Sequence, residues 1–298
     1  MKSLIIGYGV QGKKRANYLK EKSYLIYDKF NSESDFSSFD QIPLEQISHA
    51  YICLPEKEKY NYIYKFLKKK INILVEKPLI LTSKEEFNIE NILKKKKATL
   101  YTAYNHRFEP HFIKTKKILD SGIIGKIYNV ELYYGNGTAK LWKNSWREKN
   151  KESILYDLGV HLLDTFNFWF GFLPEKFYTS IKSKNELKCF DFVNFNSEKK
   201  FKSSFTVSVI DWRNKFEANI IGEKGSIHIN SLCKWGPSKL TVRKRIFPSG
   251  KPKERIITKT CNDPTWKIEE KYFRKISKQK INNFLNDVLI KKSLNKIL

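Results

Sequence analysis

The sequence predicts an α/β protein with two domains, because two patterns follow one another along the chain. Over the first hundred residues, short apolar runs alternate with helical patterns. After about residue 108, longer runs that look like antiparallel strands follow, with turn sequences at 222–225 and 248–250. The chain has 298 residues, 41% hydrophobic and 14% aromatic, which is enough for two separate cores.

The first part of the chain predicts a doubly wound parallel sheet, since its strands and helices alternate. We expect short elements in the Ser-, Asp- and Phe-rich stretch 31–46, and a domain that spans residues 1–108. Strands are predicted over 2–6, 24–27, 49–54, 71–75 and 98–104, and helices over 12–20, 57–69 and 83–96.

The second part, residues 109–298, predicts a different arrangement. A helix over 110–120 precedes a strand over 126–134, and a second helix carries Asp157 and His161. The tail over 266–297 is predicted to be helical. Further strands are predicted over 176–182, 188–195, 201–211, 215–221, 225–230 and 239–247.

The net charge of +26 raises the question of a nucleic-acid partner. The lysine runs 68–70 and 94–97 each end a helical pattern just before an apolar strand, where cations face the negative end of the helix dipole. No one-sided basic stripe or recognition motif accompanies the charge. We therefore expect no nucleic-acid partner, and attribute to the charge an attraction for anionic substrates.

The apolar runs predict where in the cell the protein is found, and the cysteine spacing predicts whether it binds a metal. The run Leu4–Ile6 is too short for a signal-peptide core, and the apolar stretch 161–173 carries Asp164 and Asn167. That stretch is too short and too polar to span a membrane, so we expect a cytoplasmic protein without membrane contact. The four cysteines lack metal-ligand spacing, so we expect no metal site.

A glycine-rich turn predicts a dinucleotide site. Gly7-x-Gly9-x-x-Gly12 follows a strand and opens a helix, and Asp28 lies twenty-one residues after Gly7 at the end of the next strand. The pyrophosphate would sit at the helix N-terminus. Asp28 favours NAD, because its carboxylate binds ribose hydroxyls and repels a 2′-phosphate. Lys29 leaves NADP open, since its ammonium can pair with that phosphate.

Two short motifs carry groups that can transfer a proton. Lys77, in Glu76-Lys77-Pro78, follows a parallel strand where ligands bind open α/β sheets, although exposed lysines in turns are common. Asp157 and His161 lie four residues apart, so a helix places them on one face. Imidazole suits abstraction of an alcohol proton, and the alternative is a buried structural histidine with Asp157 as a helix cap.

Gly159 lies between these two residues and is a poor helix former, so it is expected to mark close approach of a ligand. Cofactor turn, lysine and Asp/His pair, in that order, indicate hydride transfer to or from an alcohol carbon.

The ordered set of motifs resembles the Gfo/Idh/MocA oxidoreductases. The resemblance covers nearly the whole chain and implies an N-terminal Rossmann domain with a doubly wound parallel sheet. It also implies a C-terminal α/β domain with an open, mostly antiparallel sheet that binds substrate and forms oligomers. The motifs are the glycine turn, Leu54-Pro55, Glu76-Lys77-Pro78, Tyr104-Asn105-His106-Arg107-Phe108, Trp146-Arg147, Asp157-Leu-Gly-Val-His161-x-x-Asp164 and Gly222-Glu-Lys-Gly225-Ser226.

The resemblance implies roles for single residues. Lys77 matches the active-site lysine, Asp157 the acid and His161 the general base. Lys77 and His161 are expected to act on the oxygen of the carbon that exchanges hydride with NAD(P), and Asp157 to orient the pair. Expected substrate-binding residues are Tyr104, Asn105, Arg107, Trp146 and Arg147. Expected cofactor-binding residues are Gly7, Gly9, Val10, Gln11, Gly12, Asp28, Lys29, Leu54, Pro55, Lys59, Glu76 and Pro78.

Two positions depart from the family pattern. Lys59 stands where the family often has histidine, which bears on a cofactor contact. Lys151-Glu152-Ser153 replaces a glycine run before the Asp157 helix, which predicts a stiffer substrate loop.

The substrate expected from the resemblance is a sugar, cyclitol or nucleotide sugar. The segments 235–238 and 248–252 are similar to those of members associated with surface-polysaccharide sugars, but they are also simple turn chemistry. The alternative function is a non-catalytic dinucleotide-binding sensor, which usually lacks the lysine or the histidine. We expect a homodimer or homotetramer that uses the outer face of the C-terminal sheet, with apolar residues Phe192, Val193, Phe205, Val207 and Val209.

Overall fold

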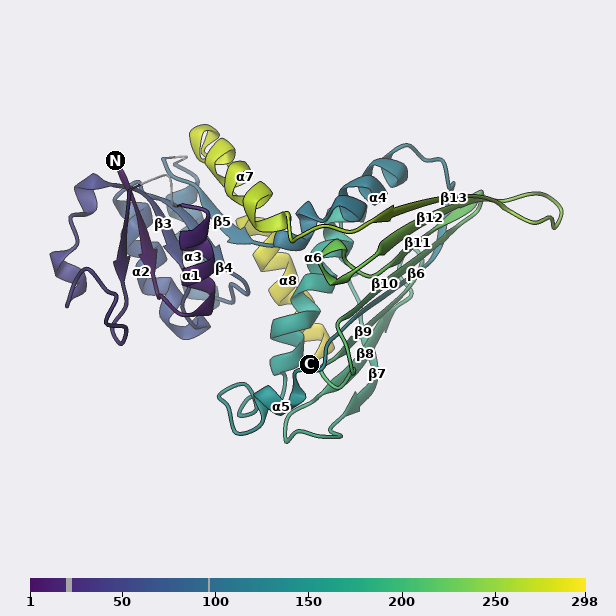
Figure 1. The fold of residues 1–298 in the computed structure, drawn as a ribbon, viewed down its shortest axis with the longest axis horizontal. Helices are drawn as coiled ribbons and strands as arrows, with labels where there is room; N and C mark the ends of the chain where they lie inside the picture. The colour runs from purple at the N-terminus through teal and green to yellow at the C-terminus, as the bar shows by residue number, and fades with distance from the viewer. Residues whose placement is uncertain (20–22, 96) are drawn as a thin grey trace. The chain divides into compact units, whose positions relative to one another are not determined.

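A computed structural model describes residues 1–19, 23–95 and 97–298 (Figure 1). The chain forms two compact units. The first contains Met1–Asn105 and Thr265–Val288, and the second His106–Pro264 and Leu289–Leu298. The functional division into residues 1–108 and 109–298 stays a prediction. Lys20 and Lys96, which fall in predicted helices, lie outside the described residues.

The first unit is built on a parallel five-stranded sheet in the order β2-β1-β3-β4-β5, which confirms the doubly wound sheet (Figure 1). Strand β1 pairs with β2 through Ile5 and Ile26, and with the central strand β3 through Ile5 and Tyr51. The strands are β1 (Lys2–Ile6), β2 (Tyr24–Tyr27), β3 (Ile47–Ile52), β4 (Asn72–Glu76) and β5 (Leu100–Ala103).

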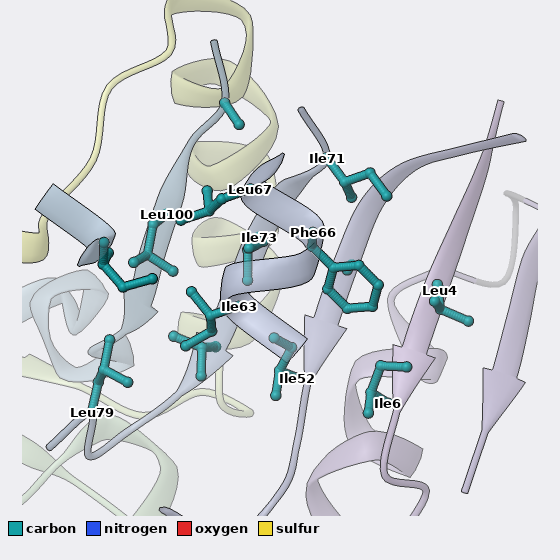
Figure 2. Close-up of a cluster of buried hydrophobic side chains, with 14 of the residues drawn as sticks. Leu4, Ile6, Ile52, Ile63, Phe66, Leu67, Ile71, Ile73, Leu79 and Leu100 are labelled. Atoms are coloured by element: carbon teal, nitrogen blue, oxygen red, sulfur yellow. The ribbon is translucent and has the colours of Figure 1, made fainter. Parts of the chain in front are cut away.

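Helices cover this sheet and complete its core. Ile63, Phe66 and Leu67 on one face of α2 pack on apolar side chains of the strands, among them Ile52 and Ile73 (Figure 2). The strands are therefore apolar on successive residues, as expected for a parallel sheet buried on both faces. The helices are α1 (Val10–Asn17), α2 (Glu56–Lys68), α3 (Ser83–Leu93) and α7 (Thr265–Gln279), with 3-10 turns at Phe39–Gln41 and Leu44–Gln46.

The second unit contains an eight-stranded sheet in the order β13-β12-β11-β10-β6-β9-β8-β7. All its pairs are antiparallel except β6 with β9, which confirms a mostly antiparallel sheet. The strands are β6 (Ile127–Gly135), β7 (Tyr178–Ser183), β8 (Phe192–Ser197), β9 (Lys202–Ser208), β10 (Lys215–Gly222), β11 (Gly225–Asn230), β12 (Ser238–Lys244) and β13 (Lys253–Lys259).

Some features of this region were not predicted from the sequence. The edge strand β13 is almost wholly exposed and rich in charged residues, so it has no apolar alternation to reveal it. The tail predicted to be helical forms two helices, α7 and α8 (Phe284–Ile297), with a break at Lys280, where φ is +56°. The remaining helices are α4 (Pro110–Asp120), α5 (Ala139–Trp142) and α6 (Val160–Phe170).

The large sheet buries its apolar residues against helices of its own unit. Val193, Phe205, Val207 and Val209 are all 0% exposed, and the Phe205 ring lies 5.4 Å from that of Phe166 on α6. The prediction that they form an outer, oligomer-forming surface was therefore wrong. The predicted strands were right, but alternation puts these side chains on the inner face.

The outer face of the same strands is polar. The Asn194 amide donates to the hydroxyls of Ser204 and Thr206, at 3.1 and 2.8 Å. His228 contacts Asn219 at 2.8 Å farther along the sheet. Phe192, the fifth residue of the predicted surface, is half-buried. A homo-oligomer remains a proposal, without the apolar face first expected for it.

The two faces can be compared at adjacent positions of β9. Phe205→Ala should destabilise the protein by about 3–5 kcal/mol, because it opens a cavity beside the stacked ring of Phe195, whereas Thr206→Ala should cost less than about 1 kcal/mol. Urea unfolding of both variants measures the difference. A larger loss for Thr206→Ala would overturn the assignment of the faces.

Candidate active site

The glycine turn between β1 and α1 is shaped by close packing. Gly7 has φ of +84°, and a Cβ there would lie 2.8 Å from the carbonyl oxygen of Cys53. A Cβ at Gly12 would lie 2.1 Å from the Gly7 oxygen. Gly9 differs, because nothing lies within 4 Å of a Cβ built on it. Two glycines are thus required by the fold, and the third leaves open space at the start of α1.

This open space fits a pyrophosphate. Gly9 is the N-cap of α1 and has no side chain to occupy the first N–H groups, and the first turn holds no acidic residue. Val10 and Gln11 are exposed, so anions can approach the first N–H groups of the helix. The residues present therefore fit a bound dinucleotide.

Asp28 is held by the main chain around it. One oxygen accepts a hydrogen bond from the Tyr8 N–H at 2.6 Å, and the other from the Phe30 N–H at 2.8 Å. Lys29 is half exposed, with its ammonium 3.9 Å from Glu58. A cavity of about 320 Å³ lies beside them, lined by Tyr27, Lys29, Phe39, Lys57, Glu58, Asn61, Tyr62 and Lys65.

A buried ion network lies behind the glycine turn. Arg15 of α1 is 2% exposed and contacts Glu76 at 2.7 Å and Glu269 of α7 at 2.8 Å. Burial raises the pKa of Glu269 to about 7; the Arg15 charge opposes this shift and the Glu76 charge adds to it. Glu76, expected at the cofactor, thus uses its side chain to bind Arg15. Neither Arg15 nor Glu269 was predicted, since long-range pairing leaves no local signal.

Lys59 and Pro78 meet at the end of β4. The Lys59 ammonium donates to the carbonyl oxygens of Glu76 and Pro78, each at 2.6 Å, and the residue is only 1% exposed. Burial lowers the pKa of Lys59 to about 8. Lys59 was expected to contact a cofactor, whereas its observed contacts are to the main chain.

Three further predicted site residues, Lys77, Pro55 and Leu54, also lie in the first unit. Lys77 is half-buried, and the Lys77–Pro78 peptide bond is cis. Pro55 caps the start of α2, and the Leu54 side chain lies 2.9 Å from a Cβ built on Gly7. Leu54 thus shapes the turn that holds the dinucleotide.

Tyr104 and Asn105, expected at the substrate, contact the C-terminal part of the first unit. The Tyr104 hydroxyl donates to Asp287 at 3.0 Å and the Asn105 amide donates to Thr265 at 2.9 Å. Tyr104 is 1% exposed. Their role toward substrate stays a prediction.

In the second unit, Asp157 and His161 lie at a change of helix type. Leu155–Gly159 forms a π-helix that continues into α6, so the spacing argument for a regular α-helix does not apply unchanged. A Cβ on Gly159 would lie 3.2 Å from the Leu155 side chain. The nearest neighbour that a side chain at Gly159 would meet therefore belongs to its own helix. Asp157 is half-buried and His161 is 7% exposed.

His161 belongs to a layer of rings. The His106 ring stacks on it with centroids 4.1 Å apart, and Tyr134 meets it edge-on at 5.7 Å. Burial raises the pKa of Tyr134, and the nearby Asp157 charge acts in the same direction. Trp235 stacks on Tyr134 at 6.1 Å. His106 and Tyr134 were missed as site residues, although His106 stands inside one of the quoted motifs.

The three remaining predicted residues form two groups. Arg107 binds the buried Asp164 through two nitrogens, at 2.5 to 3.0 Å. The Arg147 guanidinium lies 4.7 Å from the centroid of the Trp146 ring, which is 64% exposed. The exposed Trp146 ring can stack on a sugar ring, and the half-buried Arg147 guanidinium beside it can bind an anion, whereas Arg107 is already paired.

Among the described residues, no group of three or more His, Cys, Asp or Glu side chains is arranged to hold a metal ion. None of the helices in that part of the chain is long and apolar enough to cross a membrane.

The chain belongs to the Gfo/Idh/MocA oxidoreductase family. Residues 1–104 match the family model described as an oxidoreductase family, NAD-binding Rossmann fold. Residues 112–228 match the model of the GFO/IDH/MocA C-terminal domain. The family, the fold class and the NAD-binding character of the N-terminal domain, all expected from the sequence, are confirmed.

Curated relatives are distant. An oxidoreductase of Formosa agariphila is 26% identical over 192 residues, 61% of this chain and 59% of that protein. A scyllo-inositol 2-dehydrogenase (NADP⁺) of Bacillus subtilis is 23% identical over 198 residues, 61% of this chain and 55% of its own. The match therefore spans less than two thirds of either relative's length.

Solved structures share the fold over the whole chain. Levoglucosan dehydrogenase in complex with NADH superimposes with a TM-score of 0.79 at 17% identity, covering 100% of this chain and 98% of that one. UDP-N-acetylglucosamine 3-dehydrogenase of Acidithiobacillus ferrooxidans gives 0.81 at 13%, covering 100% and 96%. A protein of Desulfitobacterium hafniense named as an NADPH-dependent oxidoreductase gives 0.84 at 16%, covering 99% and 92%.

The raised pKa of Glu269 predicts a pH effect on stability. Because the pKa of Glu269 is higher in the folded state than its usual value of 4.5, the folded state binds this proton more tightly than the unfolded state. The resulting stability is fully present below pH 4.5 and is lost as the pH rises through about 7. Glu269→Gln has no such loss. The free energy of unfolding of the variant minus that of the wild type should therefore increase by about 1–3 kcal/mol between pH 5 and pH 8. Urea titrations at the two pH values test this, and a constant difference would contradict it.

Proposed function

We propose that this protein is an NAD(P)-dependent dehydrogenase or reductase that acts on a CH–OH or keto carbon of a sugar, cyclitol or nucleotide sugar. One observation carries the proposal: the chain keeps a lysine, an aspartate and a histidine in its two site regions, together with a turn that fits a dinucleotide. The inositol and levoglucosan dehydrogenases among its relatives and structural neighbours support the substrate class. A role in making surface-polysaccharide sugars remains part of the proposal.

The proposed chemistry divides between a cofactor and the chain. When bound, the nicotinamide supplies the position that accepts or donates hydride. His161 takes the hydroxyl proton of the substrate, because an imidazole changes protonation near neutral pH. Asp157 orients the reacting groups, and Lys77 donates a hydrogen bond to the substrate oxygen.

The proposed substrate-binding residues are chosen by the exposure and charge of their side chains. Trp146 and Arg147 offer an exposed ring and a guanidinium, which suit a sugar face and a phosphate or hydroxyl group. Arg107 and Asp164 support the helix that carries His161. The class is tested by incubating the protein and NAD⁺ with myo-inositol, levoglucosan, D-glucose and UDP-N-acetylglucosamine and following the absorbance of NADH. The proposal would be contradicted if none of them reduced NAD⁺ and none of the corresponding ketones oxidised NADH.

The role of His161 is tested by separating rate from stability. His161→Ala should lower the single-turnover rate by about 10²- to 10⁴-fold, the usual value of a positioned acid–base group. NADH affinity should remain near that of the wild type, since the glycine turn and Asp28 do not depend on this residue. Stopped-flow absorbance and a melting temperature are measured on one sample.

Thr165→Val is the matched control, because Thr165 is 1% exposed on the same helix and the change keeps its volume. It should keep the wild-type rate. If His161→Ala lowers the melting temperature but leaves turnover of the folded protein unchanged, His161 is structural.

Cofactor choice is expected to depend on Asp28. Its fixed carboxylate disfavours a 2′-phosphate, so NADH should bind at least about 10-fold more tightly than NADPH, or ~1.4 kcal/mol. Asp28→Ser should reduce this ratio, and Lys29→Ala should increase it. Calorimetric titration with both cofactors measures it, and equal or reversed affinity in the wild type would mean that Lys29 decides.

A further inference from the structure

The chain segment that carries Lys77 is held by a buried cation. Lys59, the fourth residue of α2, donates to the carbonyl oxygens of Glu76 and Pro78 at 2.6 Å each. These are the residues immediately before and after Lys77. A single ammonium therefore binds the main chain on both sides of the lysine proposed to contact the substrate.

A second cation holds the same segment through a side chain. Arg15 binds the Glu76 carboxylate at 2.7 Å, and Arg15 is itself bound by Glu269. Glu76 is thus fixed at both its carbonyl and its carboxylate. Lys77 follows it at a half-buried position.

Stability alone does not account for a lysine at position 59. The other buried residues on α2, Ile63, Phe66 and Leu67, are apolar. Burying an ammonium is costly, and an apolar side chain of similar volume is often neutral or stabilising in its place. What the ammonium adds is two charge-assisted hydrogen bonds with defined directions.

The charges around Lys59 come from three elements. Burial lowers its pKa, and the Lys77 charge acts in the same direction. Glu56, on the same helix, and Glu76 oppose the shift. The Cys53 thiol, just after β3, stays neutral because burial raises its pKa.

We propose that Lys59 is a positioning residue for Lys77. By binding the carbonyls of Glu76 and Pro78, it fixes the backbone from which the Lys77 ammonium reaches the substrate oxygen. The inference rests on the proposed function of Lys77. A displacement of about 1 Å in such a group can cost ~10²-fold in rate, so a fixed backbone has a direct effect on turnover.

Lys59→Met removes the ammonium and keeps an unbranched side chain that reaches to the position of the lysine Cε. We expect an unchanged or higher melting temperature, NADH affinity within about 3-fold of wild type, and turnover lower by about 10- to 100-fold. Amide exchange of residues 77–81 in the protein without cofactor, measured by mass spectrometry, should become faster. This readout needs no substrate. Lys68→Met, an exposed position on the same helix, is the control and should match the wild type in every measurement.

The double variant Lys59→Met/Lys77→Ala identifies the route of the effect. If Lys59 acts through Lys77, the double variant is no slower than Lys77→Ala alone. A purely structural Lys59 would give a lower melting temperature with normal turnover per folded molecule, which would overturn the proposal. So would unchanged exchange and turnover in Lys59→Met.

Failure of the proposed function looks different, because Lys77→Ala itself would then retain wild-type turnover. If Lys59→Met does not fold, Lys59→His and Lys59→Leu are compared instead. Lys59→His keeps a donor for the main chain and should show slow amide exchange and part of the wild-type rate. Lys59→Leu has no donor and should show neither.

Discussion

A buried arginine joins the parts of the first unit on which its ligand site depends. Arg15 belongs to the helix that follows the glycine turn, and its guanidinium contacts Glu76 at the end of β4 and Glu269 on α7. The Trp266 ring lies 4.2 Å from the guanidinium. Removing one partner of a buried pair costs about 3–5 kcal/mol, because the remaining charge is left uncompensated. The turn that fits the dinucleotide and the strand that leads to Lys77 are therefore fixed to one another.

The basic residues of the chain fall into an exposed group and a buried group. The 57 lysines and arginines include many at helix ends, such as Lys68, that lie on exposed surface. Arg15 and Lys59 are instead almost fully buried, and each binds groups close to Lys77. The exposed lysines therefore contribute to the net charge of the surface, whereas Arg15 and Lys59 hold the segment that carries Lys77.

The second unit arranges its residues by the alternation of its strands. Apolar side chains such as Phe205 face the helices, and polar ones such as Asn194 face outward. His161 lies on the covered side, in a layer with His106 and Tyr134. These aromatic neighbours limit the solvent around the proposed base. The side chains of Asn194, Ser204 and Thr206 would offer hydrogen bonds, not apolar area, to a second copy of the chain at this part of the outer face.

The sequence by itself determined the order and type of nearly all elements, since helices and strands follow from periodicity and the glycine turn from its spacing. It also predicted Lys77, Asp157 and His161 as proton-transfer residues, and that prediction rests on local motifs. Only the tertiary structure decided which face of each strand is buried, and that Lys59 binds main chain instead of lying open to a cofactor. The ion pairs of Arg15 with Glu76 and Glu269 likewise became visible only in the tertiary structure. Burial and ion pairing join residues 17 to 254 positions apart, and such contacts leave no periodic or local signal in a single sequence.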